Sequence, residues 1–163
     1  MHPYNLRELT LAYDEQLFYE LILTTDDYFS DYQMTIPSLE EVRSEFWLDV
    51  PSNTQLSQKK LLGIFSGNEL VGFVDVLLDY PESQSATLGY LVLHQKMREQ
   101  GWGSLIYQQI ETQLVQNNYL HMRLGVITDN LPAYHFWEKM GFTPYDTIIT
   151  DYGEQTNMQK SLK

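Results

Sequence analysis

The residues best suited to hold a ligand lie in one segment, 91–104, with the sequence LVLHQKMREQGWGS. This segment follows an apolar, β-favouring run and leads into a helical pattern. Gly101 and Gly103 carry no side chains, so a ligand can approach the backbone closely there. A helix that begins at this point offers unpaired N–H groups and the positive end of its dipole, close to Lys96 and Arg98. The segment is therefore suited to bind a short anion such as a pyrophosphate.

The two glycines alone are not a specific signal. The segment lacks the third glycine of the dinucleotide-binding fingerprint and the Gly-Lys-Ser/Thr of a P-loop, and a simple turn is an alternative. A second element, however, lies downstream at residues 130–142, with the sequence NLPAYHFWEKMGF. Pro132 suits a first helical turn, an apolar stripe follows at helical spacing, and Gly141 is placed to end the helix.

Together the two segments resemble the motifs of the GNAT acetyltransferase superfamily. Residues 98–103, REQGWG, are similar to its pyrophosphate loop, Q/R-x-x-G-x-G/A. Residues 130–142 are similar to its later motif, N-x-x-A-x-x-hydrophobic-Tyr-x-x-x-G-F. The motifs occur in the family's order, separated by one expected helix and one expected strand. The resemblance covers roughly residues 60–162, and more loosely the two helices expected before them.

The resemblance implies both a fold and a cosubstrate. The fold is α/β (α+β): one mixed, mostly antiparallel sheet, splayed between its fourth and fifth strands and flanked by about four helices. Acetyl-CoA lies in the resulting cleft, where backbone groups of Leu91 to Leu93, including Val92, contact its pantetheine arm and polarise the acetyl carbonyl. Asn130 faces the pantetheine, although capping of the next helix is an alternative role. The amides that bind the pyrophosphate are those of Arg98, Glu99, Gln100, Gly101, Trp102, Gly103 and Ser104.

One position departs from the family pattern. Where many members carry a Tyr thought to protonate the departing thiolate, this chain has Trp137. An indole N–H donates a hydrogen bond but is no acid at neutral pH. Tyr134, one turn earlier, and Tyr107, on the preceding helix, are possible replacements. A thiol of pKa around 8.5 leaves tolerably as its anion, so the loss need not abolish activity. A role for Trp137 in the core is favoured, and by the family resemblance Trp137 is also expected to contact the cofactor.

The general base has no fixed motif position. Asp75 is a candidate because it interrupts an apolar strand, and the alternative is that it faces solvent on an amphipathic strand. Tyr90 and His94, near the end of the strand that would contact the cofactor, are further candidates. The four His residues lack the spacing of metal ligands, so no metal is expected.

Acceptor recognition has one candidate segment, residues 26–32, with the sequence DDYFSDY. Three carboxylates interleaved with aromatic rings could hold a cationic amine, and the favoured alternative is a solvated acidic loop. Glu41, Glu45 and Asp49 recur at i+4 and are interpreted as a solvated helix face.

The elements that must position these residues follow from periodicity. Helices are expected over 11–23, from an N-cap at Ser38 with Glu41 in a capping box, over 103–116, and after Pro132. Strands are expected over 4–9, 61–66, 69–78, 86–93, 121–127, 143–150 and 155–162, with a hairpin turn at Gly67-Asn68. Length favours a single domain over residues 1–163.

Composition narrows the function classes. Ten Lys and Arg residues against twenty-two Asp and Glu residues give a net charge of −12, which disfavours nucleic-acid and membrane-surface partners. The chain has no Cys, so it has no disulfide, thiolate metal site or cysteine nucleophile. No apolar run approaches membrane-spanning length, and a cytoplasmic protein is expected. The acidity suits a cationic acceptor.

We therefore expect an acetyl-CoA-dependent N-acetyltransferase that moves the acetyl group directly to a primary amine of a small, cationic acceptor. A first alternative, motivated by Trp137, is a non-catalytic acyl-CoA-binding or sensing domain. A second is an acyltransferase acting on tRNA, against which the acidity counts. The family resemblance also allows a homodimer, though no segment indicates an interface.

Overall fold

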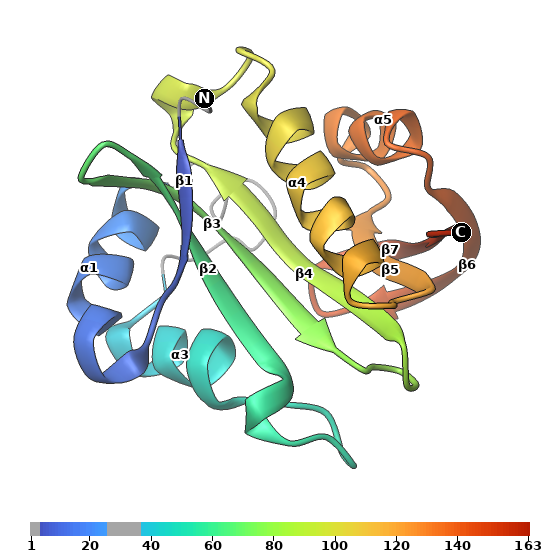
Figure 1. The fold of residues 1–163 in the computed structure, drawn as a ribbon, viewed down its shortest axis with the longest axis horizontal. Helices are drawn as coiled ribbons and strands as arrows, with labels where there is room; N and C mark the ends of the chain where they lie inside the picture. The colour runs from blue at the N-terminus through green and yellow to red at the C-terminus, as the bar shows by residue number, and fades with distance from the viewer. Residues whose placement is uncertain (1–3, 26–36) are drawn as a thin grey trace.

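The computed structural model describes residues 4–25 and 37–163. In these residues seven strands form one sheet in the order β1-β2-β3-β4-β5-β7-β6 (Figure 1). The strands are β1 (Asn5–Glu8), β2 (Lys59–Ser66), β3 (Glu69–Leu78), β4 (Ser85–Leu93), β5 (His121–Ile127), β6 (Thr143–Thr150) and β7 (Gly153–Ser161).

The sheet is mixed because β4 and β5 run parallel, whereas the other neighbouring strands pair antiparallel. Pairing of β4 with β5 covers only its first residues and stops at Leu88 opposite Leu124. Strand β4 continues to Leu93 and β5 continues to Ile127, but these last residues of the two neighbouring strands do not pair with each other. The expected fold class and the splay between the fourth and fifth strands are confirmed.

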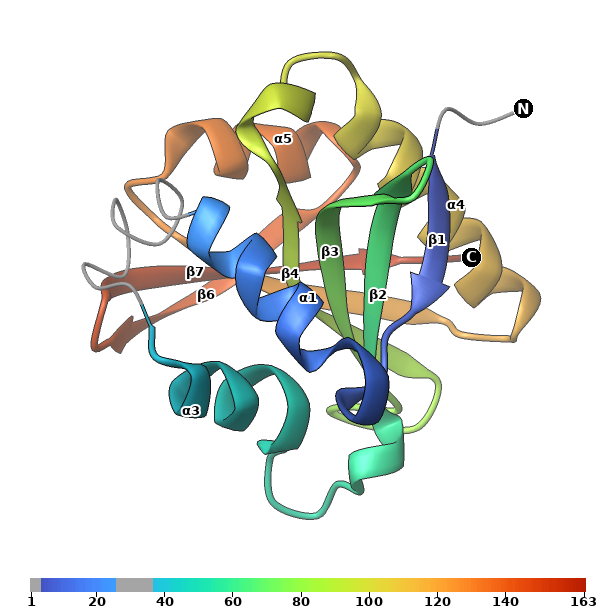
Figure 2. The ribbon, with the colours of Figure 1, turned by 90° about the vertical axis from the view of Figure 1, so that its left-hand side faces the viewer.

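Helices cover both faces of the sheet (Figures 1 and 2). On one face α1 (Leu11–Thr24) and α3 (Leu39–Val42), which continues into the π-helix η1 (Arg43–Leu48), pack in one core cluster with β2, β3 and β4. On the other face α4 (Trp102–Gln116) and α5 (Leu131–Lys139) form a second cluster. Two short 3₁₀ turns, η2 (Leu56–Gln58) and η3 (Gln95–Met97), complete the described elements.

Local signals explain several helix ends. Ser38 and Glu41 form the expected capping box, with hydrogen bonds of 3.2 and 3.1 Å between each side chain and the other residue's backbone N–H. Gly141, just after α5, has a φ of +102°, which favours glycine. The part of the chain that the structure describes contains no helix long and apolar enough to cross a membrane.

The second helix departs from its expected form, because residues 43–48 adopt π-helical geometry. Phe46 and Trp47 are both buried there, and both pack edge-on against Phe18 of α1, with ring centroids 5.3 and 5.6 Å away. Two consecutive aromatic side chains of this wider turn therefore pack into the same core. π-helical turns are rare and often mark functional sites.

Candidate functional site

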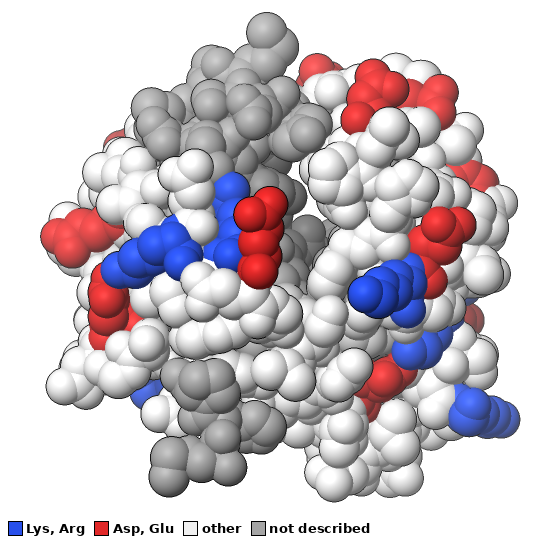
Figure 3. All heavy atoms as spheres, turned by 90° about the horizontal axis from the view of Figure 1, so that it is seen from above, with Lys and Arg blue, Asp and Glu red and all other residues white. Residues whose placement is uncertain are grey.

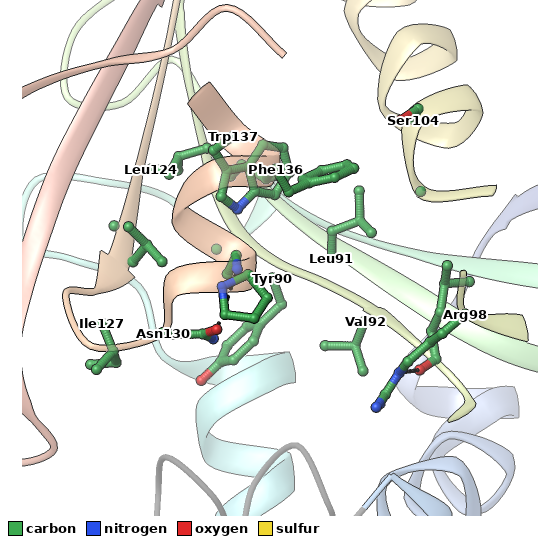
Figure 4. Close-up of a pocket in the computed structure, with 18 of the residues that line it drawn as sticks. Tyr90, Leu91, Val92, Arg98, Ser104, Leu124, Ile127, Asn130, Phe136 and Trp137 are labelled. Atoms are coloured by element: carbon green, nitrogen blue, oxygen red, sulfur yellow. Dashed lines mark hydrogen bonds between the residues drawn. The ribbon is translucent and has the colours of Figure 1, made fainter. Parts of the chain in front are cut away.

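A cavity of about 770 Å³ occupies the splay between β4 and β5. Its walls come from the end of β4, the loop that follows it, the first turn of α4, the end of β5, helix α5 and the β6–β7 hairpin. Figure 4 shows side chains from β4, β5 and α5 around one space. The cavity reaches both faces of the sheet, because Leu91 packs with the α4 side and Tyr90 with the α1 side.

The backbone at the end of β4 has a defined orientation. The N–H of His94 donates to the carbonyl of Val71, at 2.7 Å. In an antiparallel ladder, bonded and non-bonded pairs alternate, so Leu93 and Leu91 occupy non-bonded positions opposite β3. Their N–H and C=O groups therefore point away from β3, toward the splay. This is the orientation that a strand needs in order to pair with a ligand.

The loop after β4 is held by its own side chains. Arg98 Nε donates to the carbonyl of Leu93 at 2.9 Å (Figure 4), and Gln100 Nε2 donates to the carbonyl of Lys96 at 2.8 Å. Gly101, with a φ of +80°, is the N-cap of α4. Because the first amides of a helix lack intrahelical partners, the N–H groups of residues 102–104 are available at the cavity wall.

Charge around this loop is mixed. Lys96 forms an ion pair with Glu69 on the neighbouring hairpin. Figure 3, which views the molecule from the side of the loop, shows Lys and Arg side chains beside Asp and Glu side chains. Binding of a polyanion here therefore depends on backbone amides and a few placed cations, not on a broad basic surface.

Of the residues expected to bind the cofactor, all but Gln100 line the cavity. Gln100 instead stabilises the loop through its bond to Lys96. Asn130 performs the alternative role, since its Oδ1 accepts a 3.3 Å hydrogen bond from Ala133 N at the start of α5, and it lines the cavity as well.

Trp137 is both core and cavity wall. Its exposed fraction is 9%, and its ring packs edge-on against Tyr107 and Phe142 with centroids 5.6 Å away in each case. Its place in the core agrees with the helical periodicity. Trp137 also lines the cavity.

The two Tyr residues considered as replacement acids do not line the cavity. Tyr134 is half-buried against the core beneath α4 and α5, while α5 presents Ala133, Phe136 and Trp137 to the cavity. Tyr107 is buried, and desolvation raises the pKa of its hydroxyl. The role of Tyr134 stays a prediction, and the geometry gives it no support.

Asp75 is not solvent-facing, so that alternative is wrong. Its exposed fraction is 8%, and Lys59 Nζ lies 3.5 Å from its Oδ2. Desolvation raises the pKa of Asp75 to about 6, against the lowering effect of Lys59 and with a further increase from Glu45. Tyr90, its cross-strand neighbour, lines the cavity and donates a 2.6 Å hydrogen bond to Glu45.

Sequence reasoning missed several of these residues. Glu45 was interpreted as part of a solvated face, but it is half-buried and bonded to Tyr90. No sequence pattern around Lys59 indicates that it contacts Asp75. The β6–β7 hairpin contributes Thr150, Tyr152 and Gln155 to the cavity, which no motif indicates. The acidic segment 26–32 lies outside the described residues.

The other candidate groups can be placed simply. The His94 side chain caps η3 by accepting from the N–H of Lys96 at 3.2 Å. Among residues 4–25 and 37–163, no group of three His, Asp or Glu side chains is arranged to hold a metal ion.

Solved structures share this architecture over nearly the whole chain. An acetyltransferase from Thermus thermophilus superimposes with a TM-score of 0.78 at 24% identity, covering 99% of both chains. A spermidine N-acetyltransferase from Vibrio cholerae, in complex with CoA and spermine, gives 0.74 at 16% identity, covering 98% of this chain and 96% of that one. The ribosomal-protein-S18-alanine N-acetyltransferase from Escherichia coli gives 0.72 at 14% identity, covering 98% and 94%.

No curated protein sequence matches the chain significantly. A family model does: that of the acetyltransferase (GNAT) family matches residues 21–142. This match spans well over half of the chain, and it includes the strand, the loop and both helices that form the cavity. The chain therefore belongs to the GNAT family of acetyltransferases.

Proposed function

We propose that the protein transfers an acetyl group from acetyl-CoA to a primary amine of a small, cationic acceptor. The observation that carries this proposal is the splay itself. The edge of β4 from Leu91 to Leu93, which does not pair with β5, borders the same cavity as the first turn of α4. Acetyl-CoA carries a pyrophosphate, which matches the first turn of α4, and a thioester carbonyl, which matches the edge of β4.

In this proposal the cofactor is held mainly by backbone. The amides at the start of α4 and the glycine-containing loop receive the pyrophosphate, where partial positive charge and close approach favour an anion. The outward-facing N–H groups of β4 receive the pantetheine arm and the acetyl oxygen. Hydrogen bonds aimed at the oxygen that becomes negative stabilise the transition state more than the ground state.

In this proposal the transfer is direct, because no cysteine is present to carry an acetyl intermediate and the spacing of the sequence indicates no Ser–His pair. The amine nitrogen attacks the carbonyl carbon, the C–N bond forms, the C–S bond breaks, and the nitrogen loses a proton. Trp137 does not supply a proton to the thiolate, which leaves as an anion of modest basicity.

A cationic acceptor is supported by three observations. The chain carries a net charge of −12, and Glu45 lies against Tyr90 at the cavity wall. The structurally similar Vibrio cholerae enzyme is a spermidine N-acetyltransferase. Polyamines and other small amines with a second positive charge are therefore the first acceptors to test.

The test combines a thiol-release assay with calorimetry. Acetyl-CoA is supplied with spermidine, spermine, kanamycin, lysine and an alanine-initiated peptide, and free CoA is measured over time. We expect CoA binding by titration calorimetry and amine-dependent thiol release with at least one polycation. CoA binding without thiol release from any amine would instead favour the acyl-CoA-sensing alternative that Trp137 motivates. Salt-sensitive tRNA binding would favour the tRNA acyltransferase.

A further inference from the structure

Strand β4 carries a bulge where it passes Asp75. In the ladder with β3, Asp75 lies opposite Tyr90 whereas the next residue, Val76, lies opposite Leu88. Gly89 is thus the extra residue of β4, directly after the last residue that pairs with β5. The bulge places Gly89 at the point where the sheet opens, and Gly89 lines the cavity.

The absence of a side chain at Gly89 leaves room beside the carboxyl group of Asp75. A Cβ atom built on Gly89 would lie 3.0 Å from Asp75 Oδ2 and 3.4 Å from its Cγ. Any other residue would therefore press against the carboxyl group and cover its side toward the cavity. The Asp75 side chain keeps an exposed fraction of 11%, so water still reaches it. We call this passage between the carboxyl group and the cavity the Gly89 opening.

Resting on the proposed function, we propose that Asp75 accepts the proton of the amine through the Gly89 opening, and that Lys59 is its positioning residue. Asp75 is the buried carboxylate nearest the free edge of β4 in the part of the chain that the structure describes. It is held from one side by Lys59, whose own side chain is only 9% exposed. Gly89, which lines the cavity, is in contact range of the carboxyl group, so in this proposal one water molecule beside Gly89 carries the proton from the cavity to Asp75.

The reacting amine first loses its ammonium proton to water, and from the neutral amine onward the proton balance is complete without another reactant. As the C–N bond forms, the nitrogen becomes cationic, one N–H bond breaks, and its electron pair stays on nitrogen. The proton passes through water to a carboxylate oxygen of Asp75, and the C–S bond breaks to release the thiolate. Asp75 then returns the proton to water or to the thiolate through the same opening. The sum is amine plus acetyl-CoA to amide plus CoA.

The groups around Asp75 set the pH at which it can act. Lys59 of β2 favours the ionised carboxylate, and Glu45 of η1 disfavours it, while the phenol of Tyr90 on β4 is bonded to Glu45. Burial is the largest effect, and the pKa of Asp75 is raised to about 6. A base with a pKa near the working pH is the most effective, because it is ionised and still basic.

The experiment measures kcat/KM against pH with the best acceptor of the amine panel, with KM expressed as the concentration of the neutral amine, because the protonated amine does not attack the thioester. The wild type should gain activity as pH rises through about 6, where Asp75 ionises. Asp75→Asn should lose this rise and lower kcat about 100-fold, with CoA affinity unchanged. Gly89→Ala, which covers the carboxyl group, should lower kcat in the same direction.

Lys59→Met keeps the proposal testable if Asp75→Asn folds poorly. Without its cation, Asp75 ionises at higher pH, so the rise in activity should move to higher pH. Lys60→Met is the matched control: Lys60 is the adjacent residue, pairs with Glu8 at 3.6 Å, and should leave the profile in place.

Different results would overturn the role of Asp75 alone and the proposed function as a whole. If the wild type is active and Asp75→Asn keeps the rise in kcat/KM near pH 6, the assignment of Asp75 is wrong. The assignment is also wrong if Lys59→Met leaves this rise at the same pH. Either result overturns the role of Asp75 and leaves the proposed function intact. A wild type that binds CoA but acetylates no amine overturns the proposed function and this inference together.

Discussion

The hydroxyl of Tyr90 donates a 2.6 Å hydrogen bond to the carboxylate of Glu45, which joins strand β4 to the π-helix η1. The Tyr90 ring also packs against Phe46 and Phe73, with centroids 4.9 and 6.0 Å away. A residue of the cavity wall is thus fixed at its ring by the core and at its hydroxyl by a helix. The position of η1 and the shape of the cavity are coupled through this pair.

Tyr90→Phe should therefore distinguish the contribution of the ring packing from that of the hydrogen bond to Glu45. The ring packing remains, but half-buried Glu45 loses the phenol, and we expect the free energy of unfolding to fall by about 2 kcal/mol. Urea denaturation measures the change. Tyr13→Phe is the control, because Tyr13 is 91% exposed and should leave stability unaltered. Equal stability of both variants would show that the Tyr90–Glu45 bond contributes nothing.

Trp137 offers a test of whether an acid is needed at its position. Trp137→Ala should lower the free energy of unfolding by about 4 kcal/mol, because it removes a ring packed against Tyr107 and Phe142. Trp137→Phe keeps an aromatic ring, so thiol release should stay within about threefold of wild type, since the indole is no acid. A loss of two orders of magnitude in kcat at unchanged CoA affinity would contradict this view.

The two loop glycines should respond differently to substitution. A side chain at Gly103 meets the Phe136 ring, 3.4 Å from the first added atom, inside the cavity. Gly103→Leu should weaken CoA binding more than about tenfold by calorimetry, since it fills the space of the ligand. Gly101 has free space around its Cβ position but a φ of +80°. Gly101→Ala should chiefly cost stability, about 1 kcal/mol. The reverse pattern would mean that the cofactor lies elsewhere.

Periodicity predicted most of the elements, because each carries an apolar stripe that must be buried. The capping box at Ser38 and the helix end at Gly141 could also be predicted from the sequence, because each depends on only a few neighbouring residues. The position of the splay followed from family resemblance alone. No local pattern states that pairing of β4 with β5 ends at Leu88.

The roles of Asp75 and Glu45 could not be read from sequence for a physical reason. Strand β3 is covered by helices on both faces, so its buried positions run continuously from Leu70 to Val76 and alternation no longer marks a solvent side. Glu45 fits an i+4 acidic series, but the π-helical turn changes the angular positions of residues 43–48. Lys59 reaches Asp75 only through the register of β2 on β3.

Asp75 also makes a prediction about stability that needs no substrate. Burial raises its pKa from 3.8 to about 6, so between these values the native state binds more protons than the unfolded state. Its contribution to stability is therefore full below pH 3.8 and is lost as pH rises through about 6. By linkage, this loss amounts to about 3 kcal/mol. Between about pH 4 and 8 the free energy of unfolding of the wild type should thus fall relative to that of Asp75→Asn. Urea denaturation across this range measures both slopes, and parallel curves would show that Asp75 titrates normally and is unsuited to accept a proton near neutral pH.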